Sequence, residues 1–364
     1  MTPATIPLIS GSELAARLDD VDLYLVDVRE PDEVEAWSIP GAHNFPLTSL
    51  ESSIADIPRN KDLVMVCAKG LRAQKGAEIL AEHGLASSVL DGGMGAWSST
   101  YDHVTGEFAG ATVVQVRRRG KGCLSYVIGA GERAVVIDPS LESSQYFEVA
   151  KANGWTITHV LDTHLHADHI SGARQLAAAA GAALWLNPAD PFHFDFEPLV
   201  DGKSIELMPG VDLRVSSVSV PGHTEGSTMY QLADEAIFTG DTLFLESVGR
   251  PDLADEAVNY AHHLYHSLHE RVLPLNDEIT VFPAHFGQGV DVHTGEFVAR
   301  KLGSLRNALP ALALDENAFV DWAVANVKDR PGNYQQIVRI NVGQDAVEGD
   351  ASELEAGPNR CAIA

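Results

Sequence analysis

The stretch that decides the fold is Thr163-His164-Leu165-His166-Ala167-Asp168-His169, which places three imidazoles and one carboxylate within six residues. It directly follows segment 157–162, whose apolar run predicts a buried strand. Because His is the commonest metal ligand in proteins, a strand that ends in such a loop predicts a metal site at the edge of a sheet.

Three more strand-like segments each end in one residue of a metal-ligand type. Segment 213–220 runs into Pro221-Gly222-His223, segment 236–240 runs into Asp241, and segment 279–284 runs into His285. We therefore expect seven metal-competent side chains to converge on one edge of the fold.

The ordered patterns H-x-H-x-D-H, G-H-T, T-G-D and P-A-H resemble the metallo-β-lactamase superfamily over residues 108–300. The resemblance implies a four-layer αββα sandwich. Strand patterns in 111–116, 124–128 and 134–137, and helix patterns in 144–153 and 170–180, fit that architecture.

Composition limits the other classes of function. The chain has 364 residues, enough for two domains, and a formal net charge of −26, which disfavours nucleic-acid and anionic-membrane partners. No apolar stretch has the length of a membrane span, and residues 1–7 do not resemble a secretion signal. Three widely spaced cysteines do not form a disulfide framework, so we expect a cytoplasmic protein.

The first hundred residues predict a second chemistry, centred on Cys67. Buried-strand patterns in 23–28 and 63–66 alternate with helical segments, which predicts a parallel α/β domain. Cys67 follows the second strand and precedes a helix predicted over 73–82, where backbone N–H groups, the helix dipole, Lys69 and Arg72 stabilise a thiolate. From its position alone, a buried structural cysteine is an equal alternative.

The surrounding motifs resemble a single-domain rhodanese: Val26-Asp27-Val28-Arg29-Glu30, Ile39-Pro40-Gly41-Ala42, Cys67-x-x-Gly70-x-Arg72 and Leu90-Asp91-Gly92-Gly93. The resemblance implies that Cys67 carries sulfane sulfur as a persulfide and that Arg72 binds an anionic donor. Asp27 and Arg29 would hold the loop beneath the site. We expect domains at 1–105 and 106–300, and a C-terminal helical extension with an acidic tail at 301–364, joined by a short polar junction near 101–107.

Two enzyme classes of the metallo-β-lactamase superfamily share these ligands. Hydrolases of the glyoxalase II type hold two metals, zinc or iron, on all seven residues, with Asp241 bridging. Persulfide dioxygenases bind one Fe(II) on two histidines and one carboxylate, whose counterparts here are His164, His223 and Asp241. The other four residues of the set then orient ligands and substrate. Those four are His166, Asp168, His169 and His285.

Two features favour the dioxygenase. Gly249-Arg250-x-Asp252 resembles the persulfide dioxygenase branch, and the joined rhodanese handles the sulfane sulfur that such an enzyme consumes. The resemblance implies that glutathione persulfide and O2 yield sulfite and glutathione, with Arg250 and Lys69 as substrate-binding residues. For Arg250, an internal salt bridge with Asp252 is an equal alternative. Thiosulfate or sulfite would be the partner of the rhodanese. A glyoxalase II-like hydrolase, a persulfide sensor without turnover, and a homo-oligomer stay open.

Other candidate residues carry less weight. His262 and His266 share one face of a predicted helix, and we interpret them as surface histidines. Cys123 opens a predicted strand and is expected to be buried. Cys361 is expected to be an exposed cysteine of the tail, with a resolving or sulfur-relay thiol as the alternative.

Overall fold

The computed structural model describes residues 6–208, 214–253, 256–287, 289–327, 330 and 332–363. Leu213 of the predicted strand 213–220 and the first five residues of the predicted N-terminal domain lie outside these ranges. The chain forms two compact units. Unit 1 comprises 1–102, 118–121 and 356–358, and unit 2 comprises 103–117, 122–355 and 359–364.

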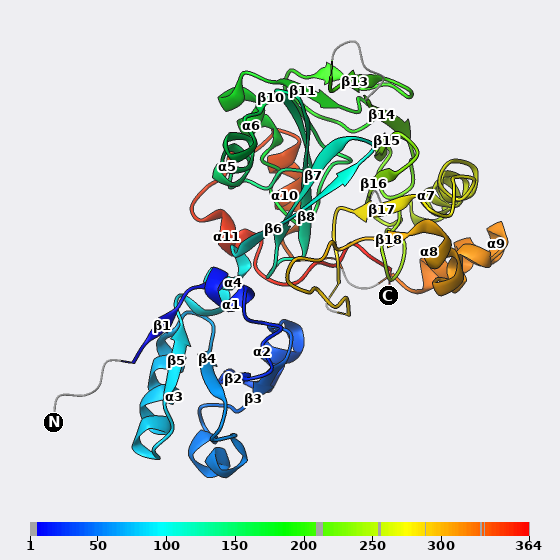
Figure 1. The fold of residues 1–364 in the computed structure, drawn as a ribbon. Coiled ribbons are helices and arrows are strands. Elements are labelled where there is room, and N and C mark those ends of the chain that lie inside the picture. The colour runs from blue at the N-terminus through cyan, green and yellow to red at the C-terminus, as the bar shows by residue number, and fades with distance from the viewer. Residues whose placement is uncertain are drawn as a thin grey trace. The chain divides into compact units, whose positions relative to one another are not determined.

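Unit 1 is a parallel sheet with the strand order β1-β5-β4-β2-β3 (Figure 1). Its strands are β1 (Leu8–Ile9), β2 (Leu23–Asp27), β3 (Ala42–Asn44), β4 (Asp62–Val66) and β5 (Ser87–Leu90). Its helices are α1 (Gly11–Ala15), α2 (Pro31–Ala36), the 3-10 helix η1 (Leu50–Asp56), α3 (Leu71–Glu82) and α4 (Gly93–Ser98).

The central strand β4 explains why this sheet is covered on both faces. Leu63 and Met65 belong to one buried apolar cluster, while Val64 and Val66 belong to another. Because successive side chains of a strand point to opposite faces, β4 has an apolar side chain for each layer of helices. The predicted parallel α/β domain is confirmed.

Unit 2 contains two sheets packed over one apolar core. The first sheet has the order β12-β11-β10-β9-β8-β7-β6, made of β6 (Tyr101–Phe108), β7 (Ala111–Arg118), β8 (Cys123–Ala130), β9 (Arg133–Ile137), β10 (Thr156–Leu161), β11 (Ala183–Leu186) and β12 (Glu197–Pro198). The second has the order β13-β14-β15-β16-β17-β18, made of β13 (Ser204–Glu206), β14 (Arg214–Ser219), β15 (Thr228–Leu232), β16 (Ala236–Gly240), β17 (Thr280–Pro283) and β18 (Arg300–Lys301).

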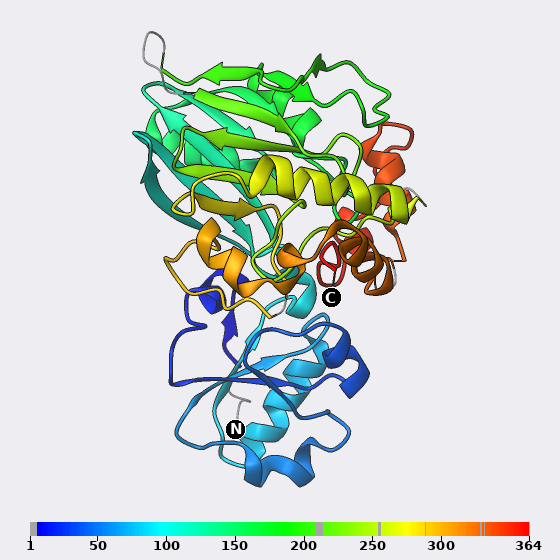
Figure 2. The same cartoon turned by 90° about the vertical axis from the view of Figure 1, so that its right-hand side faces the viewer.

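Helices cover the outer faces of both sheets. In Figure 1, α5 (Ser144–Asn153) and α6 (Ala173–Ala180) lie outside the first sheet and α7 (Ala257–His266) lies outside the second. Figure 2 shows α7, in yellow, in front of the strands of the second sheet. The remaining helical segments are η2 (Ser267–Val272), α8 (Leu302–Ala308), η3 (Pro310–Ala313), α9 (Glu316–Ala325), α10 (Tyr334–Asn341) and α11 (Ala351–Leu354). The expected αββα sandwich is confirmed.

The structure adds detail to three expectations for unit 2. The helix predicted from residue 170 begins at Ala173, and the N–H groups of Ile170 and Ser171 before it donate to Glu355 and Asn341. The junction predicted near 101–107 is strand β6, and Glu355 of the expected surface tail is buried. No helix among the described residues is long and apolar enough to cross a membrane.

Candidate functional site

The seven predicted metal-competent residues lie in loops that follow strands of both sheets of unit 2. The His cluster follows β10, His223 follows β14, Asp241 follows β16, and His285 follows β17. All seven side chains are buried: His164, His166, Asp168, His169, His223, Asp241 and His285. The structure therefore brings together the set that the sequence predicts.

His164, His223 and Asp241 form one group of metal-competent atoms. Their ligand atoms lie within 4.8 Å of one another. Nε2 of His164 and Nε2 of His223 are each 3.4 Å from Oδ2 of Asp241, and none of these three atoms has a hydrogen-bond partner among the described residues. Donors bound to one ion at about 2.0–2.1 Å in tetrahedral geometry lie about 3.3 Å apart. The three residues fit a single metal ion.

The other ring nitrogens of these histidines are fixed by neighbours. His223 Nδ1 donates to the carbonyl oxygen of Arg250 at 2.9 Å. His164 Nδ1 lies 2.8 Å from the Thr163 hydroxyl, which itself donates to Asp138. Both rings are thereby turned so that Nε2 faces Asp241, as in histidines whose second nitrogen is held by an acceptor.

A second group lies beside the first and includes a residue that sequence reasoning missed. Ligand atoms of Cys123, Asp168, His169 and His285 lie within 4.8 Å of one another. His285 Nε2 is 3.3 Å from Asp168 Oδ2, and His169 Nδ1 is 3.0 Å from Asp168 Oδ1. Cys123 is buried as expected, but no local motif marks it as part of a site. It arrives there because it forms a β-bridge with His285.

His166 faces a different set of carboxylates. Its Nε2 lies 3.3 Å from Asp138 Oδ1, and Asp138, Asp162 and His166 form their own group of ligand atoms. Asp138 has a left-handed backbone with φ of 52°, uncommon for a residue other than glycine, and accepts the Thr163 N–H at 2.6 Å. The role of Asp138 was missed because its apolar strand β9 carries no motif.

The pKa values of the first group are set by the charges that its members place on one another. Burial alone raises the pKa of the Asp241 carboxyl, but the charges of His285 and His164 outweigh burial and hold that pKa well below its usual range. Burial lowers the pKa of His223 to about 4, against the opposing charge of Asp241. Burial lowers the pKa of His164, but the charge of Asp241 outweighs burial and raises it, so a metal at this site would displace a proton from His164.

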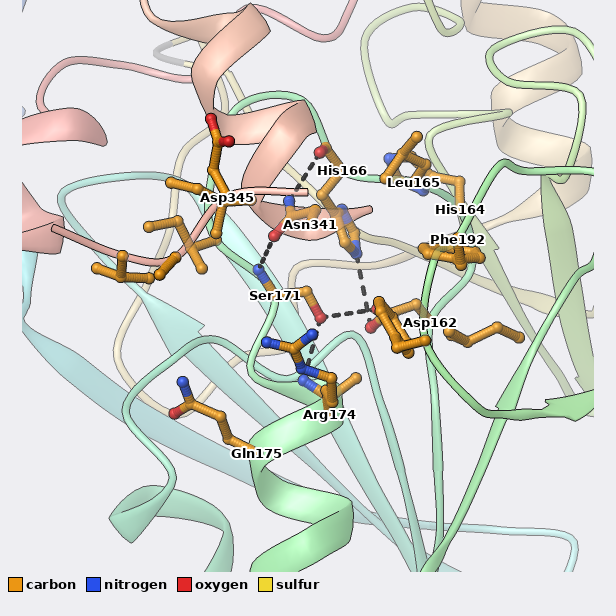
Figure 3. Close-up of a pocket in the computed structure, with 17 residues that line it drawn as sticks. Asp162, His164, Leu165, His166, Ser171, Arg174, Gln175, Phe192, Asn341 and Asp345 are labelled. Atoms are coloured by element: carbon orange, nitrogen blue, oxygen red, sulfur yellow. Dashed lines mark hydrogen bonds and ion pairs between the residues drawn. The ribbon is translucent and has the colours of Figure 1, made fainter. Parts of the chain in front are cut away.

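Two pockets reach this region from different sides. One of about 270 Å³ is lined by Ala167, His223, Tyr260 and Tyr334, among others. The other, of about 280 Å³, is shown in Figure 3 and lies against Asp162, His164 and His166, with Arg174 and Phe192 on its walls. Leu165 lines both pockets.

The C-terminal segment 359–363 closes one side of the site. The Asn359 side-chain amide donates to Asp168 Oδ2 at 3.0 Å, the Arg250 N–H donates to the Cys361 carbonyl at 2.9 Å, and the Ile363 N–H donates to Val248 at 3.0 Å. Cys361 is buried, and its sulfur lies within 4.8 Å of ligand atoms of Asp241 and His285. The expectation of an exposed tail cysteine was wrong, because backbone pairing draws the segment inward.

Arg250 is fully engaged inside the protein. Its guanidinium donates to both carboxylate oxygens of Asp252, at 2.7 and 2.9 Å, and to the carbonyl of Arg360. Asp252 also accepts from Arg330 Nε at 3.1 Å, and Arg330 donates to the Tyr334 hydroxyl at 2.6 Å. Direct binding of substrate by Arg250 stays a prediction, and the structure assigns its charge to this internal network.

In unit 1, Cys67 follows β4 and lies at the beginning of α3. The buried sulfur accepts hydrogen bonds from the N–H groups of Gly70 and Ala73, both at 3.2 Å. Beneath it, Arg29 pairs with Asp27 at 2.6 Å, as the sequence predicts for a structural pair. Lys69 is exposed on the same loop. The Cys67 sulfur thus lies in a cradle of backbone N–H donors.

The histidines of α7 are surface residues, as interpreted from the sequence. His262 Nδ1 lies 2.7 Å from Glu316, and His266 Nδ1 lies 2.9 Å from Glu270.

Comparisons with known proteins agree with both resemblances. A family model described as "Metallo-beta-lactamase superfamily" matches residues 118–285, and one described as "Rhodanese-like domain" matches residues 10–100. The mitochondrial persulfide dioxygenase ETHE1 of Bos taurus is 34% identical over 183 residues, which cover 48% of this chain and 69% of that protein.

Two further matches bear on the choice between the enzyme classes. Hydroxyacylglutathione hydrolase of Methylococcus capsulatus is 36% identical over 163 residues, 43% of this chain and 58% of that protein. The crystal structure of ETHE1 from Myxococcus xanthus superimposes with a TM-score of 0.56 at 26% identity, covering 64% of this chain and 99% of that one. Both classes are thus relatives, and the family expectation is confirmed.

Proposed function

We propose, since the chain belongs to the metallo-β-lactamase superfamily and carries an N-terminal rhodanese-like domain, that it is a two-domain enzyme of sulfane-sulfur metabolism. Its metal domain is a non-haem Fe(II) persulfide dioxygenase that converts glutathione persulfide and O2 into sulfite and glutathione. Its rhodanese domain transfers sulfane sulfur through Cys67.

The proposal rests on the different contacts of the two carboxylate oxygens of Asp241. His285 Nδ1 lies 2.6 Å from Oδ1, which leaves Oδ2 facing His164 and His223. A carboxylate held in this way offers one oxygen to one metal. Two histidines and one carboxylate with open positions suit Fe(II), which when bound would supply the activation of dioxygen. His166, Asp168, His169 and His285 then orient these ligands.

The pocket lined by His223 suits the persulfide. Leu165, Ala167 and Leu253 give it apolar walls, and Tyr260 and Tyr334 bring hydroxyl groups. Arg330 holds the Tyr334 hydroxyl, and Asp252 links Arg330 to Arg250. Arg250 therefore acts on the substrate as a positioning residue, through Asp252, Arg330 and Tyr334, and not through direct contact.

A glyoxalase II-like hydrolase is the second candidate function. The group of Cys123, Asp168, His169 and His285 favours it, because these atoms lie close enough to hold a second metal. A hydrolase of this kind makes its nucleophile from water bound between two ions. Metal content separates the two candidates.

The test uses the full chain reconstituted anaerobically with ferrous iron. We expect about one iron per chain. Addition of glutathione persulfide in an oxygen electrode is expected to cause oxygen uptake with the appearance of sulfite. His164→Ala should abolish uptake, whereas Cys67→Ser should retain it. Two metals per chain, no oxygen uptake, and hydrolysis of a glutathione thioester would establish the hydrolase instead.

A further inference from the structure

The guanidinium of Arg72, next to the Cys67 loop, is held by an acidic residue of α2. Arg72 Nη1 lies 2.6 Å from Oε2 of Glu33, and Nη2 lies 2.8 Å from Oε1. Both side chains are about one-third exposed, at 36% and 34%. Arg72 and Glu33 thus form a bidentate ion pair with two charge-assisted hydrogen bonds, which is the strongest arrangement for arginine and a carboxylate.

Glu33 is itself fixed in place by residues beneath the loop. Its backbone carbonyl accepts a hydrogen bond from Arg29 Nη1 at 3.2 Å, and Arg29 is anchored by the buried Asp27. Its side-chain oxygen also accepts the N–H of Glu30 at 3.3 Å, in a capping box at the start of α2. The carboxylate is therefore positioned before any donor arrives.

The Arg72–Glu33 ion pair reduces the positive charge near Cys67 that could attract an anionic sulfur donor. Arg29 is neutralised by Asp27, and Arg72 by Glu33, so neither arginine offers an unopposed positive charge beside the Cys67 thiolate. A sulfur oxyanion such as thiosulfate carries two negative charges and needs that compensation. A persulfide with its terminal S–H attached brings no charge to the reacting atoms.

We propose that Glu33 is a specificity-determining residue that makes Cys67 exchange sulfur with thiols and persulfides in preference to thiosulfate and sulfite. The inference rests on the proposed sulfurtransferase function of Cys67 and narrows its substrates. Because sulfur transfer is reversible, the same pairing disfavours thiosulfate as donor and sulfite as acceptor. Cys67 would therefore receive sulfur from persulfides and pass it on to thiols.

The chemistry of the two routes differs only in the leaving group. With a persulfide donor, the Cys67 thiolate attacks the terminal sulfur, the donor S–S bond breaks, and the donor sulfur leaves with the electron pair as a thiolate. With thiosulfate, the same attack expels sulfite, which leaves with the electron pair and both negative charges. In each case Cys67 gains one sulfur atom, and no external oxidant or reductant is required.

The test compares donors on the full chain. Cys67 loading is followed by intact-protein mass, as the gain of one sulfur atom, over a range of glutathione persulfide or thiosulfate concentrations. Glu33→Gln keeps an oxygen for the Glu30 N–H but removes the charge. We expect this variant to raise the second-order rate constant for loading from thiosulfate about tenfold and to leave that for glutathione persulfide within about twofold.

Glu35→Gln is the matched control, because Glu35 lies on the same helix, is exposed, and loses the same charge on substitution. It is expected to leave both rate constants unchanged. Lys69 is identical in all three proteins, so its attraction for anions does not affect the comparison. An unchanged thiosulfate rate constant in Glu33→Gln, or an equal increase in Glu35→Gln or with both donors, would overturn the inference. Failure of wild-type Cys67 to gain sulfur from either donor would overturn the proposed sulfurtransferase function itself.

Discussion

His285 Nδ1 lies 2.6 Å from Oδ1 of Asp241, while Oδ2 of the same carboxylate lies 3.4 Å from Nε2 of both His164 and His223. One carboxylate thus joins the two groups of metal-competent residues. On the dioxygenase proposal, its first oxygen is occupied by a histidine and only its second oxygen is available to iron.

The two oxygens of Asp241 should therefore respond differently to mutation. Asp241→Asn removes the charged ligand and is expected to abolish retention of iron. His285→Ala removes only the partner of Oδ1 and is expected to weaken iron binding about 10- to 100-fold. Metal analysis after dialysis against graded chelator measures both, with His262→Ala on the surface of α7 as the control. Equal losses in His285→Ala and Asp241→Asn would show that His285 is itself a ligand.

Gly249 is required because it packs against the metal ligands. A Cβ at this position would lie 1.9 Å from the Asp241 carbonyl oxygen and 3.2 Å from Cβ of His223. Gly249→Ala should cost about 1–3 kcal/mol of folding stability and displace Asp241. Thermal unfolding and iron content are the measurements. Gly289→Ala, where a Cβ would meet nothing within 4 Å, should change neither.

The neutral side-chain amide of Asn359 donates a hydrogen bond to Asp168 from the C-terminal segment, so a negative charge at position 359 should be unfavourable. Asn359→Asp would place a second carboxylate about 3 Å from Asp168 Oδ2, where like charges repel strongly. We expect a lower melting temperature without metal and weaker iron retention. Asn307→Asp, on the exposed side of α8, is the control. A variant with normal iron content would show that segment 359–363 does not support the site.

The Arg250–Asp252 pair predicts a pH dependence of stability. Burial alone raises the pKa of Asp252, but hydrogen bonds from Arg250 and Arg330 outweigh burial and lower it. Because the pKa of Asp252 is lower in the folded state, its ionised form stabilises the protein at pH values above its unfolded-state pKa of about 4. This stabilisation is lost as the pH falls through the folded-state pKa. Asp252→Asn should therefore cost about 2 kcal/mol at pH 7 and less near pH 3.

Unfolding of the wild type and Asp252→Asn at both pH values measures this difference, with exposed Asp195→Asn as the control. A stability difference that does not narrow on acidification would contradict the assigned ion pair.

The sequence predicts that metal-competent residues gather in one region, because each of them follows a short apolar strand. That loops from two different sheets meet there, and that His164, His223 and Asp241 form one group, follows from the family resemblance and not from the strand pattern. The thiol loop was predictable from the strand pattern, since Cys67 lies between a strand and a helix. In both cases, local sequence and fold agree.

The residues that sequence reasoning missed reach the site through long-range contacts. Cys123 is placed by its bridge to His285, and Cys361 by backbone pairing with the Arg250 loop. Their neighbours in sequence carry no ligand pattern. The pairing of Arg72 with Glu33 was missed because Glu33 stands 39 residues away, on another helix.

The contact between Asn359 and Asp168 spans 191 residues of sequence. On a translating ribosome, the His cluster emerges long before the segment that closes over it. Until then, Asp168 lacks its amide partner and the loop of Arg250 lacks its neighbouring strand. Metal that binds the finished geometry therefore binds only after synthesis has passed segment 359–363, so formation of the site depends on both ends of this 191-residue span.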